Sequence, residues 1–331
     1  MKKGLLLLRV SLMVLLPILA AGCLNPKIKL FTDETDPLQE FTLEGAGAEK
    51  VLVIPVEGFL SDQSRGGVLR RHPGAVQALV SQIRKAEKDK KIRAVVLKVN
   101  SPGGTVTASD ILHHELMRYK TENGVTIVAV MMDVAASGGY YIALPADHIV
   151  AHPTSLTGSV GVIFAAPRLS GLMDKVGVDV HVVKSGRNKD MGSPFRETTP
   201  EENALFQDII GELAGRFYDR VLESRTLSAE SMAEVRTARI FTADQALQLG
   251  LVDEVGYLSD ALEAARRATG IAPDSRVVIY RRTAYPDDTV YNIHSGSSGR
   301  TPALVDTGLS DWLPRLDAGF YYLWPAALPA E

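Results

Sequence analysis

Three continuous runs of apolar residues, separated by helical segments, constrain the fold of this chain most. The runs are residues 50–58 (KVLVIPVEG), 92–99 (IRAVVLKV) and 125–132 (VTIVAVMM). Runs of this length and composition are typical of strands that are buried on both faces. Apolar residues recur at helical spacing in 72–91, and a second helix is expected over 107–120. Strands that alternate with helices predict a layered α/β fold with crossover connections.

A long amphipathic helix is expected from Pro200 to about residue 225. Thr199 is placed as its N-cap, Pro200 at its first position and Glu202 where a capping box closes. In the same way, Thr107 and Asp110 have capping-box spacing at the start of an earlier helix. Further expected elements are a strand at 178–184, a helix at 256–270 and a strand at 276–282.

The N-terminus has the pattern of an export signal. Lys2, Lys3 and Arg9 precede an apolar stretch at 10–21, and the small residues of LAAGC end at Cys23. This arrangement resembles a bacterial lipobox, in which the cysteine is lipidated and becomes the first mature residue. The alternative is an uncleaved transmembrane anchor, because residues 5–21 are long enough to leave the two interpretations open. Since Cys23 is the single cysteine, no disulfide can form within the chain.

The length and charge of the chain limit its domain organisation and the partners that it could bind. The chain has 331 residues, 23% of them charged, and a formal net charge of −3. This balance, without a long basic run, argues against nucleic acid as the main partner. The polar residues 24–47 have weak periodicity and predict a tether between a membrane and the folded part. The residues beyond about 283 are rich in Gly, Ser, Pro and Thr, and no role can be assigned to them from their composition.

A serine with small neighbours follows the third apolar run, in DVAASGGYYIA. Ser137 lies between two alanines and two glycines, at the expected end of a strand. A nucleophilic serine needs an exposed oxygen and nearby backbone N–H donors for the oxyanion that forms on attack. Gly138 and Gly139 allow a sharp turn into a helix, whose first N–H groups have no partner within the helix. Tight helix–strand packing explains the same pattern without any catalytic role.

A second glycine turn, VNSPGGTV, follows the strand at 92–99. Gly103 and Gly104 permit positive φ or a close backbone approach. A phosphate-binding loop is one interpretation, although neither G-x-G-x-x-G nor G-x-x-x-x-G-K-[ST] is present. A second source of oxyanion donors is the other, because both glycine turns follow strands of one layered fold.

The base that would accept the serine proton is not evident from local sequence. His148 and His152 flank a short expected strand, where half-exposed histidines are common. His113 and His114 are adjacent on a helix and diverge by about 100°, so they are poor joint metal ligands. No H-E-x-x-H or C-x-x-C motif supports a metal site.

Lysine is the remaining candidate for the base. A lysine acts as a base only when it is neutral, which requires its pKa to fall by roughly 3 units from about 10.4. Lys184 and Lys189 lie in KSGRNKDMGSPFRETTPEE, where either one is, by local sequence alone, an ordinary solvated loop residue.

Taken together, five blocks resemble the signal peptide peptidase A family of serine–lysine peptidases, in its short form. They are VLVIPVEG, AVVLKVNSPGGTVTASD, VAVMMDVAASGGYYIALPADHIVAHPTSLTGSVGVI, VVKSGRNKDMGSPFRETTPEE and ARIFTADQALQLGLVDEVG, in family order over residues 48–270. The resemblance implies a crotonase/Clp-protease-like layered α/β fold of repeated β-β-α units that assembles into a ring. It also implies an endopeptidase that degrades cleaved signal peptides and other extended or misfolded polypeptides, without a metal or cofactor.

The resemblance assigns roles to individual residues. Ser137 corresponds to the nucleophile, Lys189 to the general base and Ser159 to the residue that orients the lysine. The backbone N–H groups of Gly104 and Gly138 correspond to the oxyanion hole. A related Clp-protease triad would place a histidine near Ser159, and no histidine is there.

The resemblance also implies an arrangement of subunits. In short members of this family the serine and lysine meet across a subunit boundary, so a homo-oligomer with shared active sites is expected. The expected organisation is a signal peptide at 1–22, a tether at 23–47, a peptidase domain at 48–270 and an extension of unknown role at 271–331. With Cys23 lipidated, we expect a lipoprotein of the cell envelope that faces the periplasm or the cell exterior.

Two other functions remain open from the sequence. A crotonase-like acyl-CoA enzyme would share the fold and the glycine turns, but it would be expected in the cytoplasm with acidic catalytic residues. A ring that binds peptides without cleaving them would need neither Ser137 nor Lys189 as reactive groups.

Overall fold

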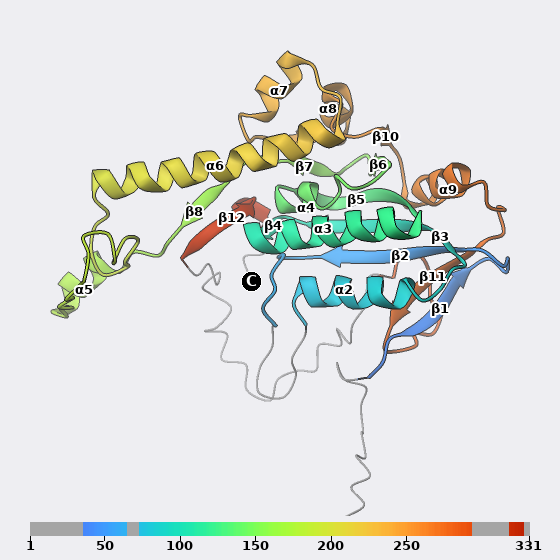
Figure 1. Ribbon diagram of the computed structural model, residues 1–331, viewed down its shortest axis with the longest axis horizontal. Helices are drawn as coiled ribbons and strands as arrows, with labels where there is room; N and C mark the ends of the chain where they lie inside the picture. The colour runs from blue at the N-terminus through green and yellow to red at the C-terminus, as the bar shows by residue number, and fades with distance from the viewer. Residues whose placement is uncertain (1–35, 65–72, 293–317, 328–331) are drawn as a thin grey trace, which may run out of the picture. The chain divides into compact units, whose positions relative to one another are not determined.

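The computed structural model describes residues 36–64, 73–292 and 318–327. In this part of the chain nine strands form one sheet, whose main path runs β1-β11-β2-β3-β5-β6-β10, with β7 paired to β5 and β9 to β7 (Figure 1). The strands are β1 (Gln39–Glu44), β2 (Lys50–Glu57), β3 (Ile92–Ser101), β5 (Thr126–Ala136), β6 (His148–Ala151), β7 (Leu156–Gly158), β9 (Ile240–Thr242), β10 (Glu254–Val255) and β11 (Arg276–Arg281).

The centre of the sheet consists of the three apolar runs. β2, β3 and β5 are parallel neighbours, as the alternation of strands and helices predicts. Alternate residues of these strands point to opposite faces, and both faces are buried. Leu52 and Leu97 belong to one apolar cluster, whereas Val53 and Val96 belong to the other. The α/β class expected from the sequence is therefore confirmed.

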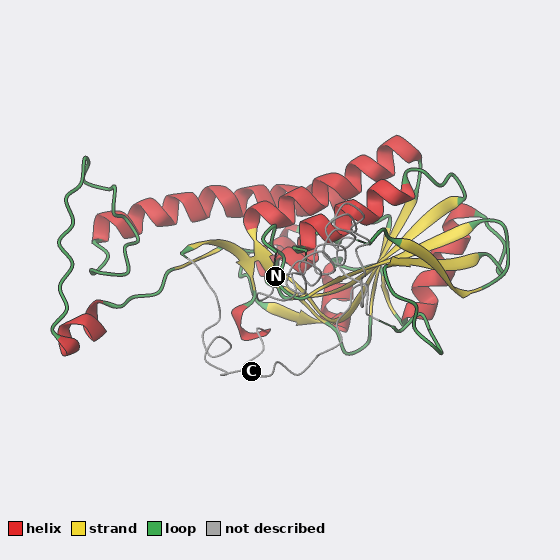
Figure 2. Ribbon diagram, turned by 90° about the horizontal axis from the view of Figure 1, so that it is seen from below, coloured by secondary structure: helices red, strands yellow, loops and turns green. Residues whose placement is uncertain are grey.

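Helices cover both faces of this sheet (Figures 1 and 2). The larger apolar cluster includes residues of α2 and α3, and the smaller one is closed by α9. α6 corresponds to the long helix expected at 200–225, and it has the expected capping box at Thr199 and Glu202. The helices are α2 (Ala75–Ala86), α3 (Val106–Asn123), α4 (Gly138–Tyr141), α5 (Ser170–Val176), α6 (Pro200–Ser224), α7 (Ala229–Val235), α8 (Ala243–Leu249), α9 (Leu258–Thr269) and the 3₁₀ turn η2 (Pro325–Ala327).

A smaller sheet of three strands is built from distant parts of the chain. β12 (Gly319–Leu323) lies between β4 (Gly103–Thr105) and β8 (Ile163–Ala165), and it is antiparallel to both. In Figure 1 this red strand is seen beside β4 and β8. The second glycine turn is thus the edge of a sheet that the C-terminal segment completes.

Two strands of the large sheet lie outside the stretch expected to form the peptidase domain. β1 falls within the expected tether at 23–47, and β11 falls within the expected extension at 271–331. The two strands pair antiparallel with each other, and β11 continues the sheet onto β2. The expected signal peptide at 1–22 and Cys23 lie outside the described residues.

Two local expectations were wrong. Residues 178–184 form no strand, because no other strand of the described chain pairs with them and their side chains are exposed. The helix expected near Thr107 begins at Val106, and its N-cap is Thr105, whose hydroxyl accepts the N–H of Ala108 at 3.2 Å.

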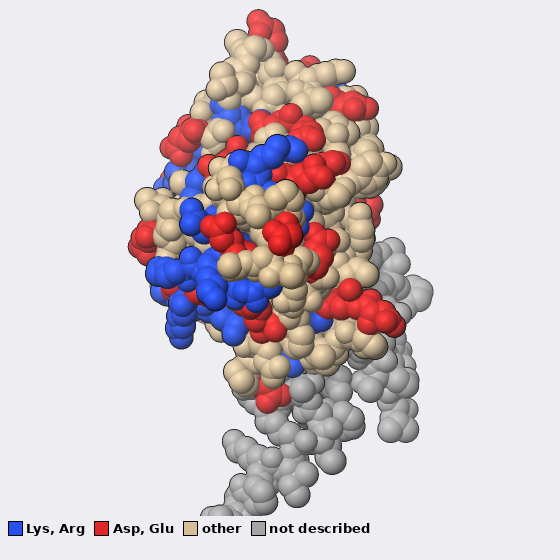
Figure 3. All heavy atoms as spheres, turned by 90° about the vertical axis from the view of Figure 1, so that its right-hand side faces the viewer, with Lys and Arg blue, Asp and Glu red and all other residues tan. Residues whose placement is uncertain are grey.

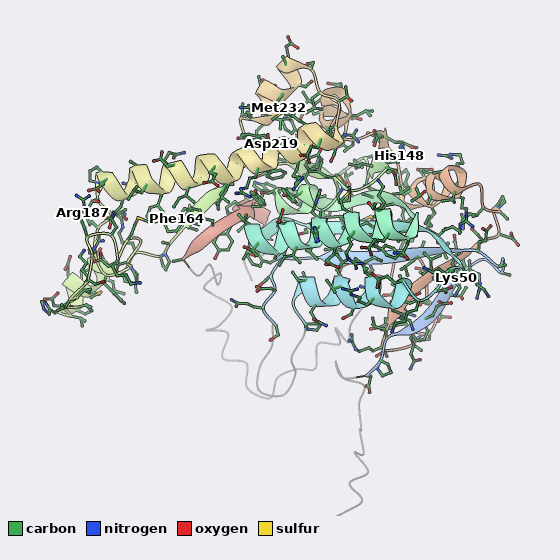
Figure 4. The ribbon with its side chains drawn as sticks, in the orientation of Figure 1. Lys50, His148, Phe164, Arg187, Asp219 and Met232 are labelled. Atoms are coloured by element: carbon green, nitrogen blue, oxygen red, sulfur yellow. The ribbon has the colours of Figure 1, made fainter. Side chains whose placement is uncertain are left out.

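Ion pairs hold together the end of the sheet at which Lys50 lies, on the right of Figure 4. Acidic and basic side chains lie side by side on this side of the molecule in Figure 3. The buried Nζ of Lys50 on β2 is 2.6 Å from carboxylate oxygens of both Glu40 and Asp89. These pairs join β1 and the turn before β3 to the central strand. None of the helices in the described residues combines the length and apolar character that a membrane span needs.

Candidate active site

Ser137 lies at the strand-to-helix turn between β5 and α4. Its backbone has φ 53° and ψ −116°, a conformation that is strained for a residue with a side chain. The neighbours hold it there, because its N–H donates to the carbonyl oxygen of Gly158 and its carbonyl accepts the N–H of Tyr141. The side chain is buried, and its Oγ has no hydrogen-bond partner among the described residues. A strained strand-to-helix turn is typical of a nucleophile. The oxygen is buried in this chain, whereas the sequence predicts an exposed oxygen.

The glycine turn after β3 approaches this serine closely. Gly103 has φ 101°, and its Cβ would lie 2.7 Å from the backbone nitrogen of Gly138. Gly104 is packed against the backbone of Leu60, so that a side chain has no room there either. Reciprocal backbone hydrogen bonds of 2.9 Å, from Leu60 to Gly103 and from Thr105 to Leu60, fix the turn. The glycines are therefore required by close packing at both positions.

Gly138 and Gly139 are also enclosed. A Cβ on Gly138 would overlap the hydroxyl of Ser109 and lie 3.0 Å from the carbonyl oxygen of Tyr322. A Cβ on Gly139 would overlap the carbonyl oxygen of Ser101. The two glycine turns thus face one another, as the sequence suggested. The first N–H groups of α4 have no partner within that helix, which is the arrangement that an oxyanion hole requires.

Ser159 lies next to the nucleophile turn through Gly158. Ser159 has φ 50° and is nearly buried, and its N–H donates to the carbonyl oxygen of Arg239 at 2.8 Å. Gly158 has φ 90°, and Phe241 and Arg239 leave no space for a side chain on it. The structure therefore brings Ser137, Gly104, Gly138 and the Ser159 turn into one region.

Lys189 lies elsewhere in the chain. It is an exposed residue of the 177–199 segment, and its backbone N–H donates to the carbonyl oxygen of Gly186 at 3.1 Å. Figure 1 places this segment beyond the N-terminal end of α6, well apart from α4. In Figure 4 the nearby Arg187 is seen at that same end. A single chain therefore does not bring Lys189 to Ser137.

Ion pairs connect the 177–199 segment, which carries Lys189, to the start of α6. Asp190 accepts Lys184 at 2.6 Å and Arg196 at 2.8 Å, and Arg196 also binds Glu202 of α6. Hydrogen bonds from Arg196 and Lys184 hold the pKa of Asp190 below its usual range. Arg196 and the backbone of Thr199 lower the pKa of Glu202 to about 2. Lys184 therefore forms an ion pair with Asp190, the residue that follows Lys189.

A buried lysine that sequence reasoning did not consider is Lys98 on β3. Burial lowers its pKa, and the same burial raises the pKa of the neighbouring Glu57. Its Nζ donates to the backbone carbonyl of Tyr291 at 3.2 Å. Since the Oγ of Ser137 has no partner in the described chain, Lys98 does not hydrogen-bond to it.

The histidines are engaged in other contacts. His148 is 3.0 Å from a carboxylate oxygen of Glu254, and His152 contacts the ring of Tyr257 edge-on. His113 packs against the ring of Tyr141, and burial lowers its pKa to about 4. In the part of the chain that the structure describes, no three His, Cys, Asp or Glu side chains gather as metal ligands would.

Sequence reasoning missed the strand that covers this region. β12 pairs with the Gly103–Thr105 strand, and the ring of Tyr322 packs against Tyr141 and Phe217. The signal that could have found it is the run GFYYLW at 319–324, an aromatic cluster in a segment otherwise rich in small and polar residues.

A strained serine, two opposed glycine turns and a mainly parallel sheet covered by helices define a serine hydrolase of Clp-protease/crotonase-like architecture. The sequence profile of Clp protease matches residues 72–156, which include both glycine turns and Ser137. The profile of peptidase family S49 matches residues 120–272.

Proteins whose sequences align with most of this chain support the same family. The chain is 33% identical to a "Putative signal peptide peptidase SppA" of Enterococcus faecium, over 76% of this chain and 73% of the relative. It is 38% identical to "Putative protease slr0021" of Synechocystis, over 68% of this chain and 76% of the relative. It is 33% identical to "Serine protease SPPA, chloroplastic" of Arabidopsis thaliana, over 82% of this chain and 39% of the relative. The chain belongs to peptidase family S49, the SppA family expected from the sequence, and is a serine protease.

Proposed function

We propose that this protein is a membrane-anchored endopeptidase whose active site pairs Ser137 of one subunit with Lys189 of a neighbouring subunit. Its substrates would be extended polypeptides, cleaved signal peptides among them. The observation that carries this proposal is the Oγ of Ser137, which is buried, lies on a strained turn and has no hydrogen-bond partner among the residues that the structure describes. A buried hydroxyl without a partner is unfavourable, so a missing partner is expected.

The chemistry follows from the groups that the proposed arrangement brings to the serine. Ser137 Oγ attacks a peptide carbonyl carbon while neutral Lys189 accepts the hydroxyl proton. The N–H groups of Gly104 and Gly138 stabilise the oxyanion of the tetrahedral intermediate. Protonated Lys189 then gives its proton to the leaving amine, which leaves an acyl-enzyme on Ser137. Water, deprotonated by the same lysine, hydrolyses the ester and restores the serine. Ser159, beside the nucleophile turn, would orient the lysine.

A second subunit is needed to bring the lysine to the serine. Lys189 is exposed and lies apart from α4, on a segment with an exposed apolar surface. Apolar exposure of this kind marks an interaction site, and a second copy of this chain is the partner that completes the active site. Burial of the amine between subunits would favour its neutral form, which is the form that acts as a base. The exposed apolar side chains are Leu172, Val176, Val178, Val180, Val182 and Val183.

The membrane anchor is proposed from the sequence of the N-terminus. Cys23 follows a charged and then apolar segment, which favours export and lipidation. Two or more acyl chains hold a protein firmly, at about 0.8 kcal/mol for each buried methylene. The protein would then act in the cell envelope, on the periplasmic or exterior side.

Labelling with a serine-reactive fluorophosphonate tests the dyad. The wild-type protein should be labelled on Ser137, whereas Ser137→Ala should not be. Lys189→Ala should lose both labelling and peptide cleavage while it keeps its assembly state. Lys184→Ala and Lys98→Met are the matched lysine controls and should retain most activity. An unlabelled wild-type protein would favour the non-catalytic scaffold, and an essential Lys184 or Lys98 would contradict the assignment of the base.

A further inference from the structure

Four side chains of alternating charge connect the residue next to Lys189 to the start of α6. They are Lys184, Asp190, Arg196 and Glu202, each six positions after the one before it and each bonded to its neighbour in this row. Arg196 is the member that contacts both carboxylates. Its guanidinium is therefore the link between the Lys189 segment and the helix.

Arg196 holds Asp190 by its side chain and by its backbone. The Nε of Arg196 donates to Oδ2 of Asp190 at 2.9 Å, and its Nη2 donates to Oδ1 at 2.8 Å. The same Nη2 donates to the backbone carbonyl oxygen of Asp190 at 3.1 Å. Two parallel hydrogen bonds between a guanidinium and a carboxylate restrict the direction of the contact as well as its distance. The backbone is thus fixed at the residue that directly follows Lys189.

Glu202 anchors this arrangement in α6. The Nη1 of Arg196 donates to Oε2 of Glu202 at 2.9 Å, and the Glu202 side chain is only 3% exposed. The same carboxylate oxygen accepts the backbone N–H of Thr199 at 2.9 Å, which closes the capping box of the helix. A carboxylate in the first turn of a helix is also stabilised by the helix dipole. Because Glu202 is fixed, Arg196 sets the backbone position of Lys189 relative to α6.

Arg196 also controls the charge beside Lys189. A carboxylate within about 4–6 Å of a lysine favours the ammonium form, which cannot act as a base. Both oxygens of Asp190 are already bonded, Oδ1 to Lys184 and Arg196, and Oδ2 to Arg196. In the part of the chain that the structure describes, Asp190 pairs with these two cations and forms no ion pair with Lys189. The two cations therefore withhold the charge of Asp190 from Lys189.

We infer that Arg196 is a positioning residue for the base Lys189: it fixes the lysine backbone against α6 and withholds the Asp190 carboxylate from the lysine amine. This inference rests on the proposed function, because the charge of Lys189 affects cleavage only if this lysine is the base. Arg196 acts through Lys189 and not on the reacting atoms. Its loss should therefore change the rate and the pH dependence of cleavage more than the binding of substrate.

The test compares full-length variants by the pH dependence of peptide cleavage. Arg196→Met removes the guanidinium, and Arg196→Lys keeps a positive charge without the paired hydrogen bonds. Arg187→Met is the matched control, because Arg187 joins the same segment to Glu201 of α6 by an ion pair at 2.5 Å. The Arg187 side chain is 77% exposed, and exposed ion pairs contribute little.

Arg196→Met should lower kcat about a hundredfold with little change in KM, since misplacement of a catalytic group by about 1 Å costs a factor of this order. The rising limb of its kcat profile should move to higher pH by about one unit, because the freed Asp190 favours the ammonium form. Arg196→Lys should restore the position of this limb but not the full kcat. Arg187→Met should match wild type in both.

Mixtures of variants show on which chain Arg196 acts, once the mass of each assembly is shown to be unchanged. Arg196→Met mixed with Ser137→Ala should recover activity, because the Ser137→Ala chains supply a correctly held Lys189. Arg196→Met mixed with Lys189→Ala should not recover, because every lysine at position 189 then lies on a chain without Arg196. Recovery in the second mixture would overturn the inference.

Equal kcat profiles for Arg196→Met and wild type would also overturn it, while the assignment of Ser137 and Lys189 would stand. If the wild-type protein cleaves no peptide, the proposed function fails, and the inference is read from the amine itself. The reaction of Lys189 with trinitrobenzenesulfonate, followed by mass analysis, should then reach half of its maximal rate at a higher pH in Arg196→Met than in wild type or Arg187→Met. Equal midpoints would reject the inference whatever the chemistry of Ser137.

Discussion

The backbone N–H of Ser137 donates to the carbonyl oxygen of Gly158, with nitrogen and oxygen 2.7 Å apart. This hydrogen bond continues the pairing of β5 with β7 and joins the nucleophile turn to the turn of Ser159. Both serines have positive φ, at 53° and 50°. The two strained turns therefore support one another, and a change at either one should be felt at the other.

Removal of the Ser137 hydroxyl should stabilise the protein. A buried hydroxyl without a partner costs about 1 kcal/mol or more, so Ser137→Ala should raise the free energy of unfolding by about 1 kcal/mol. Ser137→Gly should raise the free energy of unfolding by about 1 kcal/mol more than Ser137→Ala does, because glycine adopts the positive φ without strain. Urea unfolding of the three proteins measures both differences. A clear loss of stability in Ser137→Ala would mean that the hydroxyl has a partner in the folded chain.

Mixtures of two inactive variants test whether the site is shared between subunits. Ser137→Ala supplies Lys189, and Lys189→Ala supplies Ser137. If both are mixed in equal amounts and allowed to exchange subunits, about a quarter of the sites should contain both groups. Peptide cleavage should recover to roughly that fraction of the wild-type rate. A mixture without activity, after exchange is shown by mass, would place both groups in a single chain.

His113 should make the fold less stable at mildly acidic pH. Burial, together with the charge of Arg220, lowers its pKa to about 4, so the unfolded chain binds more protons than the folded one between pH 6.5 and 4. Stability therefore falls as the pH falls through this window, by about 2 kcal/mol between pH 7 and pH 5. Urea unfolding at both values should show that His113→Leu removes most of this difference. The exposed neighbour provides the control, because His114→Leu should leave the difference in place.

The Cys23 assignment predicts the behaviour of the protein in cell fractions. Cys23→Ser should either release the protein from membranes or block its maturation, since the acyl chains are attached to that sulfur. Fractionation with mass analysis of the N-terminus distinguishes the two results. A Cys23→Ser protein that is fully processed and still bound to membranes would show that the lipobox assignment is wrong.

Local pattern was sufficient to predict the core of the fold. β2, β3 and β5 are continuous apolar runs because they are buried on both faces, and the capping box at Thr199 and Glu202 is confirmed. In contrast, β1, β11 and β12 could not be assigned to their sheets, because their partners are distant in sequence. Residues 178–184 have the alternation of a strand but no partner strand in the described chain, and they do not form one.

The candidate site also has one part that local sequence predicts and another part that it does not. The glycines around Ser137 reflect close local packing, so composition alone pointed to that turn. Under the proposed arrangement, the approach of Lys189 to Ser137 depends on contacts between chains, which no spacing in the sequence encodes. The aromatic pocket of Tyr141 and Phe217 was missed because its filler, Tyr322, is more than a hundred residues away.

The exposed position of Lys189 at the far end of α6 has a consequence for where proteolysis can begin. Under the proposed arrangement, a newly exported chain is inert without any propeptide, since its own Ser137 and Lys189 do not meet. Catalytic output would then rise more steeply than in proportion to the amount of protein. Confinement by a lipid tether to two dimensions would concentrate the chains, so the bilayer itself would act as the trigger.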